Sequence, residues 1–184
     1  MFGALKKCIY NVNHVVIFKL DPPFYIDLQK DSHIIFFKSF DEVPHKIASQ
    51  LFSTPLSLLM KHRLKHKKAV LICYMKEDRL VAYGWVQDWC CFKYLRKIVP
   101  KATMLGPFWT HPSCRGQGIY GKMLEFSLSL SNNNELAIIY ASVNNESSLK
   151  GIRKKNFQEL GLAKIFSIFT VIKFVRMLRS YPSS

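Results

Sequence analysis

The sequence predicts a mixed α/β fold, in which helices pack against a twisted sheet. Two apolar runs flank the short turn KED at residues 76–78 and predict an antiparallel hairpin. Further along, an apolar strand, a glycine-rich loop, an amphipathic helix and a buried strand follow one another between residues 103 and 143. Strands and helices mix along the chain without internal repeats or low-complexity segments. This order is typical of α/β or α+β domains.

The N-terminal part is predicted to contain two strands followed by two helices. HVVIFKL (14–20) is rich in β-branched residues and ends at DPP, and HIIFFKSF (33–40) has a similar composition. Asp41 is a candidate N-cap for the helix DEVPHKIASQL, whose first turn carries acidic residues. PLSLLMKHRLKH (55–66) predicts a second helix, and its basic C-terminal end suits the helix dipole.

The central and C-terminal parts are predicted to supply most of the sheet. AVLICYM and RLVAYGWVQDW form the hairpin, and TMLGPFWTHP predicts a strand interrupted at Gly106 and Pro107. Apolar residues at three- and four-residue steps over 119–130 predict a helix that begins directly after the glycines. LAIIYASV (136–143) is almost continuously apolar, as in a strand buried on both faces. A helix near 147–155 and the strand-like KIFSIFTVIKFV complete the chain.

Length and charge narrow the functional classes. A chain of 184 residues, with 49% hydrophobic and 21% charged residues, fits one globular domain over 1–184. Lysine and arginine number 27 against 12 acidic residues, giving a net charge of +15. This excess indicates a partner rich in negative charge, which is a nucleic acid, an anionic membrane face or a phosphate-bearing ligand.

Cysteine usage and hydropathy indicate a soluble, cytoplasmic protein. The five cysteines are odd in number and lack metal-ligand spacing, so we expect reduced thiols and no metal site. The first residues, MFGALKKCIYNVNHVVIF, interrupt their apolar run with charged and polar residues and do not resemble a signal peptide. No uncharged run reaches the roughly 18 residues of a membrane-spanning helix.

The stretch HPSCRGQGIYGKML (111–124) is the strongest candidate site, because a glycine loop before a helix is a common phosphate-binding arrangement. A P-loop is excluded, since no hydroxyl residue follows Lys122. The spacing Gly116-x-Gly118-x-x-Gly121 matches a dinucleotide fingerprint literally. However, asparagines follow the next strand where an acidic residue is expected, and only about 60 residues remain for further parallel strands.

The third interpretation is an acyl-CoA site, because this stretch resembles the GNAT superfamily of acyl-CoA-dependent N-acyltransferases. The family's loop, Arg/Gln-x-x-Gly-x-Gly/Ala after a strand ending in x-Pro, corresponds to residues 115–120 behind Pro112, with Tyr120 in place of a small residue. Its second element, Asn-x-x-Ser/Ala followed by a helix ending in Gly-Phe, corresponds to NESSLKGIRKKNF (145–157). Asn156 stands where glycine is usual, and asparagine also suits a left-handed helix terminus.

The resemblance implies a mixed, twisted sheet of about six to seven strands with helices on both faces. Its central strands, near 103–111 and 136–143, would splay apart around the cofactor, and 102–160 would form the acyl-CoA-binding core. Residues 1–30 would form an N-terminal extension or an extra strand. The implied contacts to acetyl-CoA come from one strand, the loop and the next helix start: Phe108, Trp109, Thr110, Arg115, Gly116, Gln117, Gly118, Ile119, Tyr120, Gly121, Asn145 and Ser148.

The resemblance also implies direct attack of an amine on the acetyl thioester. Many relatives protonate the departing thiolate with a tyrosine in the helix before Gly-Phe, where this chain has Ile152. Another group such as Tyr140 then does so, or the thiolate leaves unassisted. No acidic residue stands on the strand before the loop, so His111 and Asp88 are the candidate bases. The alternative is that neither is catalytic, and that His111 is an exposed loop residue and Asp88 a solvated carboxylate at a strand end.

The acceptor is expected to be a small-molecule amine with negative charge, because KHRLKHKK (61–68), KYLRKIVPK (93–101) and the C-terminal stretch are basic. A fainter resemblance, to GNAT proteins of bacterial surface polysaccharide synthesis, suggests an amino sugar, also as a nucleotide conjugate. The alternative is a degenerate GNAT domain that binds nucleic acid or an anionic membrane, where a helical tail would lie on the bilayer. Nucleic acid is disfavoured because aromatic residues do not interleave the basic runs, and a homodimer remains open.

Overall fold

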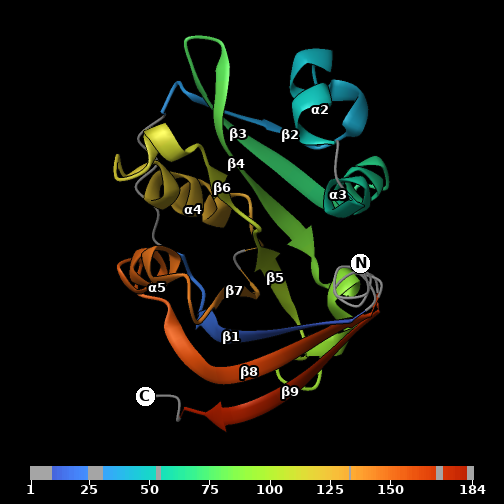
Figure 1. Cartoon of the computed structure of the whole chain (residues 1–184), viewed down its shortest axis with the longest axis vertical. Coiled ribbons are helices and arrows are strands. Elements are labelled where there is room, and N and C mark those ends of the chain that lie inside the picture. Colours follow the sequence, from blue (N-terminus) through green and yellow to red (C-terminus); the bar gives the residue numbers. More distant parts are fainter. Residues whose placement is uncertain (1–9, 25–30, 53–54, 133, 169–171, 182–184) are drawn as a thin grey trace, which may run out of the picture.

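The computed structural model describes residues 10–24, 31–52, 55–132, 134–168 and 172–181. In this part of the chain, nine strands form one twisted sheet (Figure 1). The strands are β1 (Tyr10–Leu20), β2 (Ile34–Phe37), β3 (Ala69–Lys76), β4 (Arg79–Asp88), β5 (Ala102–Leu105), β6 (Trp109–Thr110), β7 (Leu136–Ser142), β8 (Gln158–Ile168) and β9 (Ile172–Ser180). The helices are α2 (His45–Leu51), α3 (Pro55–Lys65), α4 (Ile119–Ser129) and α5 (Glu146–Arg153), with 3-10 turns η1 (Phe40–Glu42), η2 (Trp89–Leu95) and η3 (Pro112–Cys114).

Helices cover both faces of the sheet, as predicted. α4 and α5 pack on one face over Phe18, Ile72 and other apolar side chains (Figure 1). α2 and α3 lie on the opposite face over Leu71 and Trp85. Neighbouring residues such as Leu71 and Ile72 serve different faces because side chains alternate along a strand. The sequence therefore predicts the mixed α/β fold correctly.

The strand count is higher than the six to seven expected. The segment predicted as one strand around 103–111 is divided at Gly106 into β5, which pairs with β4 and β7, and β6, which pairs with β4. The C-terminal segment forms two antiparallel strands, β8 and β9. The alternative in which a helical C-terminal tail lies on an anionic bilayer required this segment to be a helix. The described part of the segment, β8 and β9, is not helical. Among the described residues, no helix is long and apolar enough to span a membrane.

The strand order is β2-β3-β4-β5-β7-β1-β8-β9, with β6 beside β4. Although β1 is the first strand of the chain, it lies inside the sheet among strands from the C-terminal part. It pairs antiparallel with β7 on one side and with β8 on the other (Figure 1). Its residues Val15, Ile17 and Phe18 are 3%, 1% and 0% exposed, so the strand is buried on both faces. A central strand of this kind holds β8 and β9 against the rest of the sheet.

Replacement of Phe18 by alanine is expected to lower the free energy of unfolding by roughly 3–5 kcal/mol, because it empties a fully buried site in a central strand. The matched control is Phe36→Ala, since the Phe36 side chain in β2 is 41% exposed and its loss should cost less than half as much. Urea denaturation measures both. Equal losses for the two variants would contradict the central position of β1.

Candidate functional site

The site is built where two parallel strands separate. β5 and β7 pair only from Ala102↔Leu136 to Met104↔Ile138. Beyond Met104, the chain turns toward β4 and continues as β6, whereas β7 continues to Ser142 along β1. The predicted splaying of the central strands is confirmed, and it leaves a gap between β6 and the second half of β7.

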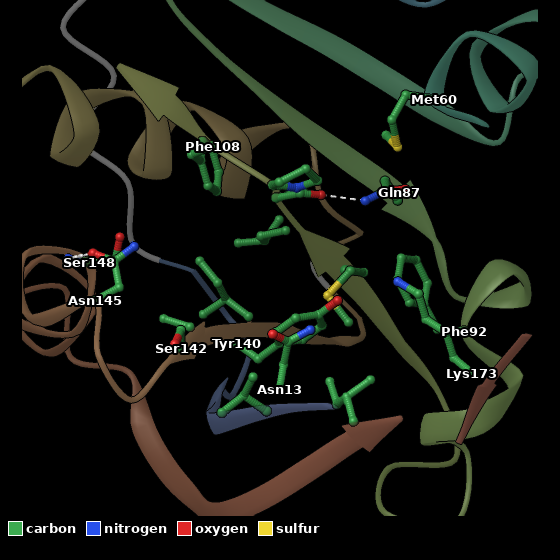
Figure 2. A pocket seen from close by; sticks show the side chains of 18 of the residues that line it. Asn13, Met60, Gln87, Phe92, Phe108, Tyr140, Ser142, Asn145, Ser148 and Lys173 are labelled. Carbon is green, nitrogen blue, oxygen red and sulfur yellow. Dashed lines mark hydrogen bonds between the residues drawn. The ribbon is translucent and has the colours of Figure 1, made fainter. Parts of the chain in front are cut away.

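A buried side chain satisfies the backbone at the point of separation. Gln87 of β4 is 3% exposed, and its amide nitrogen donates a hydrogen bond to the carbonyl oxygen of Gly106 (Figure 2). The Gln87 amide oxygen accepts a hydrogen bond from the Arg63 guanidinium of α3. The Gly106 amide donates to the Trp85 carbonyl oxygen at 2.7 Å. Thus both backbone polar groups of Gly106 are bonded although β7 is out of reach.

A groove of about 950 Å³ lies beside the glycine loop, between α4, α5 and β6. Gly116 and Gly118 have left-handed φ values of 76° and 75°, and a Cβ atom at either would meet no atom within 4 Å. Gly118 is the N-cap of α4 and offers no side-chain cap, so the first amide groups of the helix lack an intrahelical partner. The loop thus exposes backbone donors to the groove.

The groove carries a net positive charge. Its lining includes Lys122, Lys155 and Glu125 together with three further cations, Arg115, Lys150 and Lys154. Lys155 pairs with Glu125, and the Lys122 ammonium lies 2.9 Å from Asp31. Among the described residues, none of the three further cations forms an ion pair.

Hydrogen bonds anchor the loop to the sheet. Partial burial opposes ionisation of Asp31, but hydrogen bonds from Lys122, His33 and Tyr74 outweigh it and hold its pKa well below the usual range. This carboxylate ties α4 to β3, where Tyr74 lies. The Arg115 Nε donates to the Thr110 carbonyl oxygen at 3.2 Å.

The second sequence element forms the opposite wall. The Asn145 side-chain oxygen accepts a hydrogen bond from the Ser148 amide at 3.2 Å and so caps the N-terminus of α5. Asn156 has φ 60°, in agreement with the left-handed terminus expected there. Ile152 is 0% exposed in the core and cannot donate a proton.

Tyr120, the residue that departs from the family pattern, stands where the groove meets a second cavity. Its ring packs edge-on against Phe108, with 5.5 Å between centroids, and its hydroxyl bonds to the Ser148 side chain. A Cβ atom at Gly151 would lie 2.7 Å from the Tyr120 ring, so the glycine provides the space for the tyrosine. Burial raises the pKa of Tyr120 well above its ordinary value, and the bond to Ser148 only partly opposes this.

The second cavity, of about 320 Å³, lies at the strand separation. It shares Phe108, Tyr120, Asn145 and Ser148 with the groove, so the two spaces adjoin. Figure 2 shows Asn145 and Ser148 at one side of this cavity and Phe92 and Lys173 at the opposite side. In the described part of the chain, no aspartate or glutamate lines it.

The structure brings most of the predicted site residues together. Of the twelve residues expected to contact acetyl-CoA, all but Gln117 line the groove. The Gln117 side chain instead bonds to Lys76 and the Ser113 carbonyl.

Of the three candidate catalytic residues, the structure places one inside the site. Tyr140 lines the second cavity, where its hydroxyl lies 3.5 Å from that of Tyr94. His111 caps η3, with its Nδ1 2.7 Å from the Ser113 hydroxyl, and the Asp88 carboxylate caps η2. Neither lines the groove or the second cavity.

Sequence reasoning missed the polar residues of the second cavity. Arg63, Gln87, Lys173 and Asn13 come from α3, β4, β9 and β1 and converge only through the tertiary fold. One signal was present, because Gln87 is a polar residue near the end of an apolar strand. In the described part of the chain, no cluster of His, Cys, Asp and Glu could hold a metal ion.

Comparison with known proteins supports the fold. No model of a known protein family matches the chain, and no curated protein sequence matches it. A protein from Novosphingobium aromaticivorans, described as an acetyltransferase of the GNAT family, is similar with a TM-score of 0.58 and 12% identity over 84% of this chain. A Drosophila protein has a TM-score of 0.58 and 14% identity over 92% of this chain. The chain spans 63% and 56% of those two structures.

A third structure, a predicted acetyltransferase from Clostridium acetobutylicum with acetyl-CoA, has a TM-score of 0.48 and 17% identity over 68% of this chain and 90% of its own length. At these identities, the likeness concerns the fold. The chain has a mixed α/β, GNAT-like fold with a twisted open sheet.

The close fit of Tyr120 and Gly151 predicts that Gly151→Ala has opposite effects on stability in the wild-type protein and in a Tyr120→Ala variant. Gly151→Ala should destabilise the wild type by roughly 1–3 kcal/mol, because the new methyl group overlaps the Tyr120 ring. In a Tyr120→Ala background it should stabilise by up to about 1 kcal/mol, through the higher helix propensity of alanine. Urea denaturation of the four proteins tests this coupling. The same effect in both backgrounds would contradict it.

Proposed function

We propose that the protein is an N-acyltransferase that transfers the acetyl group of acetyl-CoA to a primary amine. One observation carries the proposal. A positively charged groove at the start of α4 adjoins a second cavity at the strand separation, so that two different ligands could be bound next to each other. A two-substrate transfer needs two sites that meet at one point, so that the reacting groups are held together.

The residues present fit acetyl-CoA. The open space at Gly116 and Gly118 admits a pyrophosphate close to the backbone, and the free amide groups of α4 would hold it. Arg115, Lys150 and Lys154 lack carboxylate partners in the described structure and would neutralise phosphate charge. The backbone of 108–110, at the edge of the gap, would align the pantetheine arm as an added strand does.

Acetyl-CoA supplies an activated thioester, which a neutral amine attacks and from which CoA leaves as a thiolate. We assign Tyr120 as the proton donor to that sulfur, because Tyr120 lines both the groove and the second cavity and its hydroxyl bonds to Ser148, which also lines both. A tyrosine phenol is protonated at neutral pH, as a proton donor must be. Tyr140, which lines the second cavity, is the second candidate for the proton donor. His111 and Asp88 line neither cavity, so either could act as a base only if protons were relayed to it from the amine.

The acceptor in this proposal is a small, negatively charged amine. Two observations support this class: the net charge of +15, and a second cavity whose described lining residues include no aspartate or glutamate. An amino sugar, free or nucleotide-linked, is one member of the class and belongs in the acceptor screen. A single cytoplasmic domain with its acyl-CoA-binding core at 102–160 stays a prediction.

Calorimetric titration tests the cofactor site with two substitutions at one residue. Wild-type protein should bind acetyl-CoA with micromolar affinity at about physiological salt, and Gly118→Trp should lose binding because the indole fills the groove. Gly118→Ala is the matched control, since it carries the same strain at φ 75° without filling the space. Absence of binding to folded wild type would contradict the proposal and favour nucleic acid or membrane as the partner.

Replacement of the Tyr120 hydroxyl should slow the chemistry and spare binding. Tyr120→Phe keeps the ring against Phe108 and is expected to lower kcat about 100-fold, with the Kd for acetyl-CoA unchanged. Steady-state kinetics with free-thiol detection measure kcat, and Tyr140→Phe serves as the comparison. An unchanged kcat for Tyr120→Phe would remove the assigned role.

A further inference from the structure

Arg63 is held in the wall of the second cavity without a counter-charge. Its side chain is half-buried, and its Nη1 donates a hydrogen bond to the Gln87 amide oxygen. Its guanidinium lies over the Phe92 ring, 4.9 Å from the centroid. Among the described residues, Arg63 forms no ion pair with a carboxylate.

These two contacts orient the guanidinium and leave it capacity to bind. A guanidinium has five N–H donors in one plane, and a single neutral acceptor cannot satisfy them. Gln87 is itself fixed, because it is 3% exposed and its nitrogen is bonded to Gly106. The orientation of Arg63 therefore depends on the same buried amide that supports the strand separation.

A second cation lies on the same side of the cavity. Lys173 of β9 lines the cavity, and its ammonium lies 5.8 Å from the centroid of the Tyr94 ring. Like Arg63, it forms no ion pair among the described residues. A partly desolvated positive charge is costly unless an anion compensates it. Two such charges line a space that none of the acidic residues described by the structure lines.

The two cations lie at the end of the cavity opposite its junction with the groove. Figure 2 shows Lys173 and Phe92, on which Arg63 stacks, across the cavity from Asn145 and Ser148 at the junction with the groove. The rest of the lining is largely apolar and includes Met60, Met104, Leu105, Ile139 and Ile165.

We infer that Arg63, assisted by Lys173, forms an anion-binding site for the acceptor, which is an amine with a carboxylate or phosphate at the end remote from its amino group. The inference rests on the proposed function of the cavity and names the substrate class. Both anions suit the planar guanidinium, which binds their oxygens in a bidentate manner. The apolar walls would contact the carbon skeleton between the two ends.

Binding of matched amines tests the inference without requiring turnover. The probes are ω-amino acids of three to eight carbons against their carboxamides, and aminoalkyl phosphates against the corresponding amino alcohols. Glucosamine 6-phosphate against glucosamine adds the sugar arm. Each is titrated calorimetrically into the full chain with CoA present, at about physiological salt. The carboxylate and phosphate arms identify which anion the site prefers.

The variants separate local recognition from overall charge. Arg63→Gln removes the guanidinium, Arg63→Lys keeps the charge without the planar fork, and Arg96→Gln removes one exposed positive charge that does not line the cavity. We expect the anionic member of at least one pair to bind at least tenfold tighter than its neutral partner. Arg63→Gln should abolish that preference, Arg63→Lys should reduce it, and Arg96→Gln should leave it intact.

Any one of three results would overturn the anion site. These are equal affinity for the charged and neutral members of every pair, binding of none of the probes, and an undiminished preference for the anion in Arg63→Gln. The acetyl-CoA titration reports separately on the proposed function. Loss of acetyl-CoA binding with intact anion preference would contradict acyl transfer and retain the anion site.

Discussion

The site depends on the hydrogen bond between the buried Gln87 amide and the Gly106 carbonyl oxygen. Where β5 leaves β7, a backbone carbonyl must lie in the interior without a strand partner, which is costly unless another group bonds to it. Gln87 supplies that bond from β4 and lets the two parallel strands separate within an otherwise continuous sheet. The same side chain holds Arg63, so strand separation and the charge of the second cavity share one support.

The position of β1 determines how the second cavity is built. Because β1 lies between β7 and β8, its residues Asn13 and Val15 line the cavity beside Tyr140 of β7. The strand also holds β8 and thereby β9, which contributes Lys173. The second cavity is thus assembled from both ends of the described chain, whereas the described lining of the groove comes from residues 108–155 alone.

This difference explains what the sequence could predict. The groove follows from local rules: the glycines and apolar spacing place the helix start at Ile119, and Asn156 adopts the expected left-handed conformation. A local rule was wrong at Asp41, because Ser39 caps a short 3-10 turn there and Pro44 precedes the helix. The second cavity could not be predicted, because Arg63 reaches it only through the packing of α3 against the sheet.

In the proposed function, the strand separation joins a groove that binds acetyl-CoA to a cavity that binds the acceptor. A crystal structure of the protein with an unreactive thioether analogue of acetyl-CoA is the sharpest test of this arrangement. We expect the pyrophosphate at the first amides of α4, the pantetheine arm between β6 and β7, and the acetyl carbonyl beside the Tyr120 hydroxyl. If the analogue binds elsewhere, or if its thioether end points away from the junction with the second cavity, the two spaces do not serve one reaction.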